Sequence, residues 1–193
     1  VSYYEVAREL QPEAVIAICG PDVRWVGNES GLGREDEWSV VPAGASSQEE
    51  IAANFLDFDA QEKDLGSRER LARAENMIWY PAECDVSIRP GWFYHTSQDL
   101  QVKSLDHMLD IYYRSVGRNS VLLLNVPPDR RGLFHENDVS RLKELRAVLD
   151  STYGEDLARG AKATADSAAD AAGKVVDGEW ESWWQAADET ATI

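Results

Sequence analysis

The chain has 193 residues, a length that suits one domain or one and a half. Hydrophobic residues make up 44% of it and charged residues 28%, which is typical of a globular protein. The net charge of −16 argues against nucleic acid and against an anionic membrane as partners, because both attract basic surfaces. A neutral ligand such as a glycan is compatible with this charge.

The two cysteines, Cys19 and Cys84, are too few for a disulfide framework, and they either pair with each other or stay as buried thiols. No run approaches the length of about 18 apolar residues that a transmembrane helix needs. The opening residues, Val-Ser-Tyr-Tyr-Glu, contain neither an initiator methionine nor a signal-peptide pattern, so we expect an internal piece of a longer protein.

The first part of the chain predicts a helix, a strand and a polar loop in succession. Residues 2–10 have an amphipathic period and predict a helix. Residues 14–19 form a continuous apolar run, as in a buried parallel strand, and a turn at residues 20–22 follows. Residues 23–29 then mix apolar and charged side chains and lead into a glycine-rich segment. A helix, a strand and a polar loop at the strand's C-terminal end are the rhythm of an α/β barrel.

The region from residue 30 to residue 76 has little periodic structure. Residues 30–66 show no clear period and carry several glycines, which predicts a long loop with at most one short helix near residues 48–56. A loop of this length inside a domain is usually functional or disordered. Residues 67–76 predict a polar helical turn.

Residues 78–95 combine aromatic rings, acids, an arginine and a histidine with small apolar residues. One interpretation is a strand–turn–strand unit that crosses a core, with Pro90-Gly91 as the turn. The other is a sugar-binding surface, because rings stack on the C–H faces of sugars while charged groups hydrogen-bond the hydroxyls. The pattern by itself leaves both interpretations open.

The following part of the chain predicts two helices around a second buried strand. Residues 104–116 carry apolar side chains at three- and four-residue steps, which predicts a helix with Ser104 as its N-cap. The apolar run at residues 121–126 predicts a buried strand, and residues 136–149 predict another helix. Helices and strands alternate over residues 1–150, so the expected fold class is α/β.

The composition changes near residues 151–153, where we expect a domain boundary. Residues 150–193 contain 3 basic and 10 acidic side chains, for a net charge of −7. Residues 157–165 alternate weakly, as a strand would, although a loose helix in this alanine-rich stretch is the alternative. Residues 175–178 predict a turn.

Four separated motifs, in order along the chain, resemble a known enzyme family. They are Arg-Trp-Val-Gly-Asn-Glu at residues 24–29, Trp-Tyr-Pro-Ala-Glu at 79–83, Ser-Ile-Arg-Pro-Gly-Trp-Phe-Tyr-His at 87–95 and Ser-Val-Gly-Arg-Asn-Ser-Val-Leu-Leu-Leu-Asn-Val-Pro-Pro-Asp at 115–129, with Gly132. Over residues 1–150 the chain resembles the α-L-fucosidases of glycoside hydrolase family 29, most of all the branch that acts on α-1,3/1,4-linked fucose. The resemblance implies a fucosylated oligosaccharide or glycoconjugate as substrate.

The resemblance also implies a (β/α)8 TIM-type barrel and a retaining mechanism. In this family an aspartate in a Trp-Phe-Asp-Gly motif attacks the sugar, and a glutamate in the Gly-Asn-Glu motif, here Glu29, acts as general acid/base. The chain contains no Trp-Phe-Asp-Gly, and Phe58-Asp59 does not fit that motif, so we expect the nucleophile upstream of Val1. Residues 1–150 would then be the later part of an incomplete barrel, inactive by itself because the nucleophile is missing.

The tail carries a second resemblance. Residues 157–165 and 175–184 resemble the opening of a galactose-binding-like, discoidin-type β-sandwich, a module that often follows this barrel. This implies a linker at residues 151–156 and a truncated sandwich start at residues 157–193. The family resemblance also implies a secreted or periplasmic enzyme.

Several single residues receive roles from the resemblance, each beside a structural alternative. Glu29 is the general acid/base or a solvated loop acid. Trp92 packs against the fucose ring or its C6 methyl group, or else it lies in the core. Arg24 hydrogen-bonds a ring hydroxyl, or it forms an ion pair with Asp22 or Glu29. Trp25 supplies an apolar wall that would help to keep Glu29 protonated.

Glu83 and Asp85 lie near a strand end, where barrel enzymes place functional groups, and Glu83 is a further candidate for substrate binding. A buried acid is normally paired, and Arg89 is the nearby candidate partner. No motif indicates a cofactor. Gly31-Leu32-Gly33 lacks the strand and helix of a dinucleotide site, and the three histidines lack the spacing of metal ligands.

Two other functions are compatible with the sequence. One is a non-catalytic fragment that binds fucose or another glycan, or that complements a missing half. The other is a different retaining glycosidase on the same barrel.

Overall fold

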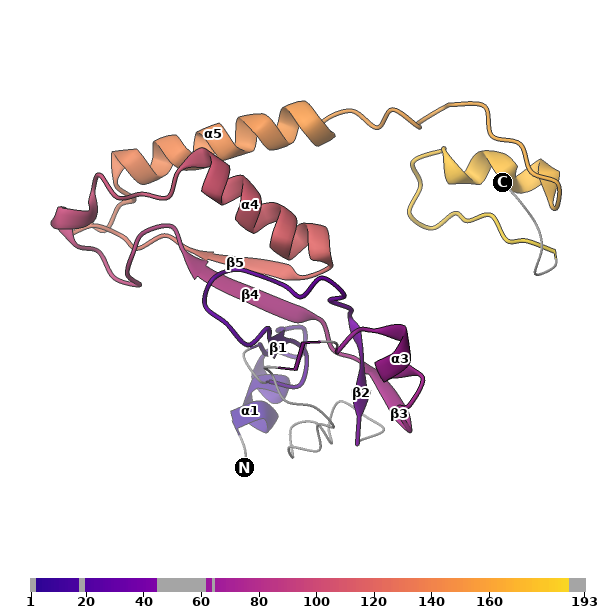
Figure 1. Ribbon diagram of the computed structural model, residues 1–193, viewed down its shortest axis with the longest axis horizontal. Coiled ribbons are helices and arrows are strands. Elements are labelled where there is room, and N and C mark those ends of the chain that lie inside the picture. The colour runs from indigo at the N-terminus through magenta and orange to yellow at the C-terminus, as the bar shows by residue number, and fades with distance from the viewer. Residues whose placement is uncertain (1–2, 18–19, 45–61, 64, 188–193) are drawn as a thin grey trace. The chain divides into compact units, whose positions relative to one another are not determined.

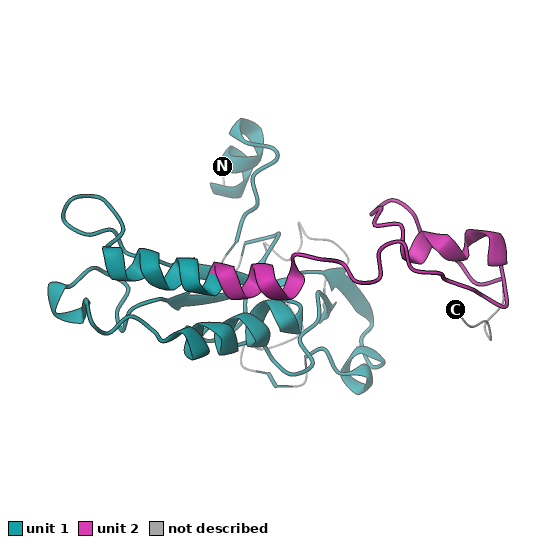
Figure 2. Cartoon of the chain, turned by 90° about the horizontal axis from the view of Figure 1, so that it is seen from above, with its two compact units in different colours: residues 1–145 teal, residues 146–193 magenta. Residues whose placement is uncertain are grey.

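The structure is a computed structural model that describes residues 3–17, 20–44, 62–63 and 65–187. The chain divides into two compact units, Val1–Leu145 and Arg146–Ile193, coloured teal and magenta in Figure 2. The division falls inside helix α5 (Glu136–Tyr153), so the predicted linker at residues 151–156 begins within a helix. No helix among the described residues is long and apolar enough to cross a bilayer.

Unit 1 is built on a three-stranded parallel sheet with the order β1-β4-β5 (Figure 1). Its strands are β1 (Arg24–Trp25), β4 (Ala82–Ser87) and β5 (Val121–Asn125). Helix α4 (Leu105–Ser115) lies between β4 and β5 in the chain, as the crossover between parallel strands requires. This strand–helix–strand unit agrees with the predicted α/β class.

The two faces of the sheet carry different side chains, because successive residues of a strand point to opposite sides. The covered face comprises Ala82, Cys84 and Val86 of β4 with their neighbours Arg24, Leu122 and Leu124 in the strand register. The open face comprises Trp25, Glu83, Asp85, Ser87, Val121, Leu123 and Asn125. Cys84 on the covered face is fully buried, whereas Leu123 on the open face is 48% exposed.

Helix α4 packs on the covered face. Ser104 caps the helix by accepting the backbone N–H of His107 at 3.2 Å, as the sequence predicted. Its side chains Met108 and Ile111 are fully buried. Gly31 has φ +73°, and a Cβ there would lie 2.8 Å from Val86 Cγ1 and 3.0 Å from Ile111 Cγ2. Only glycine therefore lets the segment after β1 approach both the sheet and the helix.

Cys84 is a free buried thiol on this face, and burial raises its pKa to about 11. Such a thiol is not reactive at neutral pH, because the thiolate is the nucleophile. The predicted buried-thiol alternative thus holds for Cys84, whereas Cys19 lies outside the described residues.

A second, two-stranded sheet joins the first through a short connection. Strand β2 (Val40–Ala43) pairs antiparallel with β3 (Asn76–Trp79), and β3 leads into β4 through Tyr80-Pro81. The N–H of Tyr80 donates to the carbonyl of Ser39 at 2.7 Å, while the carbonyl of Pro81 accepts the N–H of Arg24 at 3.0 Å. The chain thus passes from one sheet to the other within two residues.

Several predicted elements are confirmed. The helix predicted at residues 2–10 is α1 (Tyr3–Leu10), and the helical turn at 67–76 contains α3 (Arg68–Leu71). The helices predicted at residues 104–116 and 136–149 are α4 and α5. The strand predicted at residues 121–126 is β5, but it is not buried, because nothing in the described residues covers its open face.

The strand predicted at residues 14–19 is wrong in its described part, residues 14–17. Asp22 accepts the backbone N–H of Ile16 at 2.7 Å, and the carbonyl of Ile16 accepts the N–H of Asp22 at 3.2 Å. These bonds close a turn where a strand would need a neighbour, and Val15 is 69% exposed. The strand of this region is β1, inside the segment predicted as a polar loop.

Two further predictions need correction. Strand β2 lies inside the predicted loop at residues 30–66, while the short helix predicted at 48–56 lies outside the described residues. The strand–turn–strand interpretation of residues 78–95 placed the turn at Pro90-Gly91, but the break between strands falls at Tyr80-Pro81. Proline has no N–H to give to a ladder, which favours a break at Pro81.

Unit 2 contains the end of α5 and the 3-10 helix η3 (Ala169–Val175). Its turn at Asp177 and Gly178, where Gly178 has φ +79°, lies in the predicted turn at residues 175–178. No strand is present among residues 146–187, so the start of a β-sandwich is not seen in the described part of the tail.

Candidate active site

The candidate site lies at the C-terminal edge of the parallel sheet. Strand β1 leads to Glu29, β4 leads to the loop that carries Trp92, and β5 ends at Asn125. Parallel strands bring these ends to the same edge, which is where open and closed α/β sheets bind their ligands.

Glu29 and Trp92 meet at this edge. The indole Nε1–H of Trp92 donates to Oε2 of Glu29 at 3.1 Å, across 63 positions of sequence. The segment after β1 is fixed by Asn28, whose Nδ2 donates to the carbonyl of Leu32 at 2.8 Å and whose Oδ1 accepts the N–H of Ser30 at 3.0 Å. Glu29 is exposed, so its carboxyl group is accessible to a ligand while one oxygen is oriented.

The Trp92 segment is tied to the ends of β4 and β5. The amide Nδ2 of Asn125 donates to Ser87 Oγ and to the carbonyl of Trp92, both at 3.0 Å. The Ser87 hydroxyl donates to the carbonyl of Gly91 at 2.8 Å. Asn125 and Ser87 therefore hold the backbone that presents the Trp92 indole to Glu29. Trp92 is 36% exposed, so it is neither a core residue nor a freely projecting one.

Trp25 and two acids lie together on the open face. The Nε1–H of Trp25 donates to Asp85 Oδ1 at 2.7 Å, and Trp25 is the register neighbour of Glu83. Glu83 is 5% exposed, and its Oε1 has no hydrogen-bond partner among the described residues. Burial, with a smaller contribution from the charge of Asp85, raises the pKa of Glu83. Glu83 is thus a carboxyl group suited to hold a proton.

Arg24 lies on the covered face, away from Trp25 and Glu83 in the strand alternation. Its guanidinium forms a buried ion pair with Glu37 and donates to the carbonyl of Tyr80 at 2.9 Å. Burial lowers the pKa of Arg24, and the negative charge of Glu37 opposes that effect. The alternative partners predicted for Arg24 are wrong, because Asp22 pairs with Arg8 instead. The predicted contact of Arg24 with a sugar hydroxyl finds no support in this position.

Arg89 is not the partner of Glu83 or Asp85, and that prediction is wrong. Arg89 follows the end of β4, and its side chain binds Asp138 of α5 and Asp99. His135 lies 3.5 Å from an oxygen of Asp99, and His107 is exposed on α4. Within the described ranges, no three or more histidine, cysteine, aspartate or glutamate side chains form a metal-binding group.

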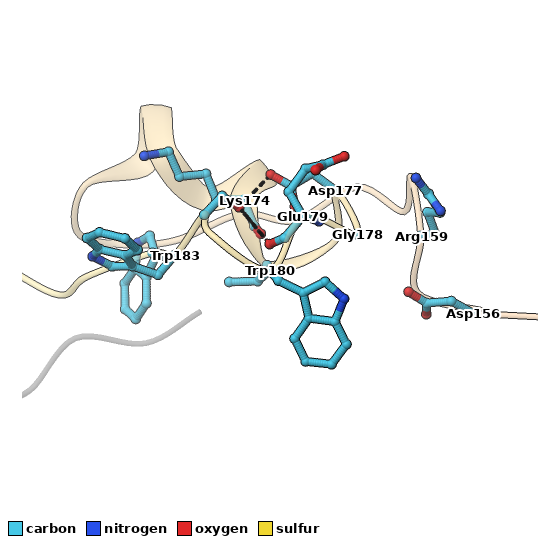
Figure 3. A pocket seen from close by; sticks show the side chains of 11 residues that line it. Asp156, Arg159, Lys174, Asp177, Gly178, Glu179, Trp180 and Trp183 are labelled. Atoms are coloured by element: carbon cyan, nitrogen blue, oxygen red, sulfur yellow. Dashed lines mark hydrogen bonds between the residues drawn. The ribbon is translucent and has the colours of Figure 1, made fainter. Parts of the chain in front are cut away.

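Several hollows lie outside this group. One of about 580 Å³ includes Gly27 and Asn28, which precede Glu29, together with charged side chains such as Arg34. Another of about 590 Å³ belongs to unit 2 and is lined in part by Trp180, Trp183 and Arg159 (Figure 3). It contains none of the predicted site residues.

The arrangement at the strand ends suits proton transfer to a polar, uncharged ligand. It combines an exposed carboxyl group oriented by an indole, a half-exposed ring and a second carboxyl group on the adjoining face. The sequence prediction missed Ser87 and Asp138, whereas Asn125 was expected to point toward this C-terminal face. A polar residue that ends an apolar run, as Asn125 does, is a usable signal, whereas Asp138 on a helix gives none.

Comparison with known proteins identifies one family. A family model described as Alpha-L-fucosidase matches residues 35–155, which include Glu83 and Trp92 but not Glu29. Alpha-L-fucosidase 1 of Arabidopsis thaliana is 40% identical over 163 residues, which cover 82% of this chain and 28% of the relative. The chain therefore spans less than a third of the length of this curated relative.

Solved structures of α-L-fucosidases are also similar to this chain. SpGH29 is 35% identical with a TM-score of 0.73, and the match covers 97% of this chain and 39% of that one. A glycoside hydrolase family 29 fucosidase of Ruminococcus gnavus, solved in complex with fucose, is 27% identical with a TM-score of 0.66. That match covers 84% of this chain and 31% of the R. gnavus chain.

Proposed function

The chain belongs to the α-L-fucosidase family, and from this membership we propose that it forms part of a hydrolase that releases terminal α-linked L-fucose from glycans. The observation that carries the proposal is the hydrogen bond between Trp92 and Glu29. It joins two of the four motifs by which the sequence resembles the family, at the sheet edge where such enzymes bind substrate.

We propose that the complete protein closes its sheet into a (β/α)8 barrel. Three parallel strands and the crossover helix α4 support this, because one face is covered by a helix and the other is not. In a closed barrel the open face would become the interior, and the half-exposed Val121 and Leu123 would be buried there. The acids Glu83 and Asp85 would then lie below the ligand.

The proposed reaction is a double displacement with Glu29 as general acid/base. A nucleophilic carboxylate bonds to the anomeric carbon as the glycosidic C–O bond breaks, and Glu29 gives its proton to the leaving oxygen. Glu29 then takes a proton from the water that releases fucose. The sequence contains no Trp-Phe-Asp-Gly motif, so we propose that another part of the protein supplies the nucleophile.

For substrate binding we propose Trp92 against the apolar corner of fucose, with Trp25 and Glu83 forming the adjoining wall. Fucose is a 6-deoxy sugar, and its methyl group suits an indole ring. Glu83 would hydrogen-bond a sugar hydroxyl, since its Oε1 has no partner among the described residues. For Arg24 we now propose a supporting role beneath β1, since Glu37 engages its guanidinium. A preference for α-1,3/1,4 linkages rests on the motif resemblance.

Two wider proposals rest on resemblance as well. The tail at residues 157–193 would open a discoidin-type β-sandwich, and the enzyme would be secreted or periplasmic. Glycan binding without catalysis is the second candidate function, for which the half-exposed Trp92 ring beside Glu29 is equally suited. Binding of fucose by the complete protein without any hydrolysis would support that candidate.

The test of the proposed function is Glu29→Gln in the complete protein. We expect hydrolysis of a natural fucosylated oligosaccharide to fall by roughly 10²–10⁴-fold, the usual contribution of general acid–base catalysis. Glu75→Gln is the matched control, because Glu75 is also exposed and lies outside the site. Near-normal turnover by Glu29→Gln would contradict the assigned role.

A further inference from the structure

A fully buried arginine joins the loop after β4 to helix α5. Arg89 and Asp138 are both 0% exposed, and they lie 49 positions apart in the sequence. The Nε–H of Arg89 reaches Asp138 Oδ1 at 3.0 Å and Oδ2 at 2.9 Å. The Nη1–H of the same guanidinium donates to Asp99 Oδ1 at 2.8 Å. One side chain thus holds two acids from two different segments.

Further contacts close the loop around this arginine. The ring of Tyr94 lies 5.0 Å from the guanidinium carbon of Arg89, within range of a cation–π interaction. The Tyr94 hydroxyl donates to Asp99 Oδ2 at 3.3 Å, and the Nδ2 of Asn137 on α5 donates to the carbonyl of Asp99 at 2.7 Å. Both ends of the segment that contains Trp92 are therefore anchored.

The guanidinium of Arg89 keeps its positive charge in this buried position. Burial alone would lower the pKa of Arg89, but the hydrogen bonds to Asp99 and Asp138 outweigh it and the pKa is raised. A buried ion pair is weak evidence for a gain in stability, because desolvation of the charges offsets their attraction. Two carboxylates on different nitrogens of one guanidinium do, however, fix its orientation: Nε donates to Asp138 and Nη1 to Asp99.

We propose that Arg89, Asp138 and Asp99 form a positioning cluster that holds Trp92 against Glu29. This inference rests on the proposed function. Trp92 lies between Arg89 and Tyr94 in the chain, so the cluster restrains its segment on both sides, while Asn125 restrains its carbonyl. Catalytic groups must stay within about 0.5 Å of their working position, and loops reach that precision only through such supports.

A positioning role predicts a dependence on the leaving group that a purely structural role does not. Departure of a natural sugar alcohol needs a proton from Glu29, whereas an activated aryl group leaves with little assistance. A displaced Trp92 would misorient Glu29 and would slow the first reaction far more than the second.

The experiment measures kcat/KM of the complete enzyme on a fucosylated trisaccharide and on 2-chloro-4-nitrophenyl fucoside. For Asp138→Asn we expect a loss of about 10²-fold on the trisaccharide, the size that a displacement of 1 Å can cause, and a loss at least about tenfold smaller on the aryl fucoside. Any loss that the two substrates share reports the contact of Trp92 with fucose. Asp150→Asn is the matched control on α5, because it breaks the exposed pair with Arg146 only. It should leave both substrates unchanged.

Folding is measured in parallel by the thermal unfolding midpoint. If Asp138→Asn does not fold, Asp99→Asn and Tyr94→Phe decide the question, since each removes a weaker part of the cluster. Equal losses on both substrates in a folded variant, or no loss on either, would overturn the positioning role. Absence of hydrolysis of both substrates by the unmodified enzyme would instead overturn the proposed function.

Discussion

Neighbouring residues in the strands of the β1-β4-β5 sheet lie on opposite faces, and the two faces differ in burial and in hydrogen bonding. On the covered face, Arg24 has a fully buried acid as its partner, and Cys84 packs without contact to solvent. On the open face, Glu83 has an oxygen without a partner among the described residues, and Leu123 is half exposed. The first face packs against α4 and the segment after β1, whereas the second has an unused carboxylate oxygen among the described residues and exposed apolar side chains.

This difference separates residues that look equivalent in the sequence. Arg24 and Trp25 are adjacent within one motif, yet one supports the sheet and the other faces the acids. Because a strand alternates with a period of two, the position within the strand decides the role of each residue. Within β1 the alternation therefore assigns Arg24 to the packed face and Trp25 to the face of the acids.

The largest effect on the covered face should come from Arg24→Met. The change leaves Glu37 buried with Arg34 as its remaining ion-pair partner, and breaking a buried pair costs about 3–5 kcal/mol in the free energy of unfolding. Urea denaturation measures this loss. The double variant Arg24→Met/Glu37→Leu should recover most of it. If Arg24→Met left stability unchanged but weakened substrate binding, Arg24 would be a sugar-binding residue instead of a structural one.

A matched pair of truncations compares the two faces directly. Ile111→Ala removes a fully buried side chain of α4 and should cost about 3 kcal/mol of unfolding free energy. Leu123→Ala removes a half-exposed side chain and should cost less than about 1 kcal/mol in this 193-residue chain. In the complete protein the cost of Leu123→Ala should rise to about 2–4 kcal/mol if a barrel closes over it. An equally small cost in both settings would argue against that closure.

The smallest effect should be a pH-dependent stabilisation by Glu83→Gln. The pKa of Glu83 is raised in the folded state, so its contribution to stability is full at low pH and declines as the pH rises from about 4.3, the value in the unfolded chain, through the folded pKa. The thermal midpoint of the variant relative to the unmodified protein should therefore rise as the pH increases from about 4 towards neutrality. A difference between Glu83→Gln and the unmodified protein that does not change with pH would contradict the raised pKa of the Glu83 carboxyl group.

The sequence predicted the elements whose signal is local. The period of residues 104–116, the cap at Ser104 and the apolar run of β5 all depend on neighbouring residues, and all three are confirmed. The strand at residues 14–19 was predicted from the same kind of apolar run, but a run becomes a strand only beside a partner. The turn bonded through Asp22 takes the backbone of Ile16 instead.

The site was harder to predict because its contacts are distant in the sequence. The motifs indicated Glu29 and Trp92 separately, and nothing in the spacing showed that one would hydrogen-bond the other. The partners of Arg24 and Arg89 were missed for a similar reason. Glu37 lay in a stretch predicted as loop, and Asp138 lay on a helix whose period gave no reason to expect a buried acid.

The connection at Tyr80-Pro81 does not tolerate an insertion or a deletion. Both of its ends are hydrogen-bonded, to Ser39 on one side and to Arg24 on the other, so the connection cannot accommodate an extra residue. A codon inserted or deleted there would shift β4 by one position and exchange its faces, turning Glu83 into the packed core and Cys84 outward. A substitution in β4 changes one side chain only. An insertion or deletion at this point would move both acids of the strand, Glu83 and Asp85, to the opposite face at once.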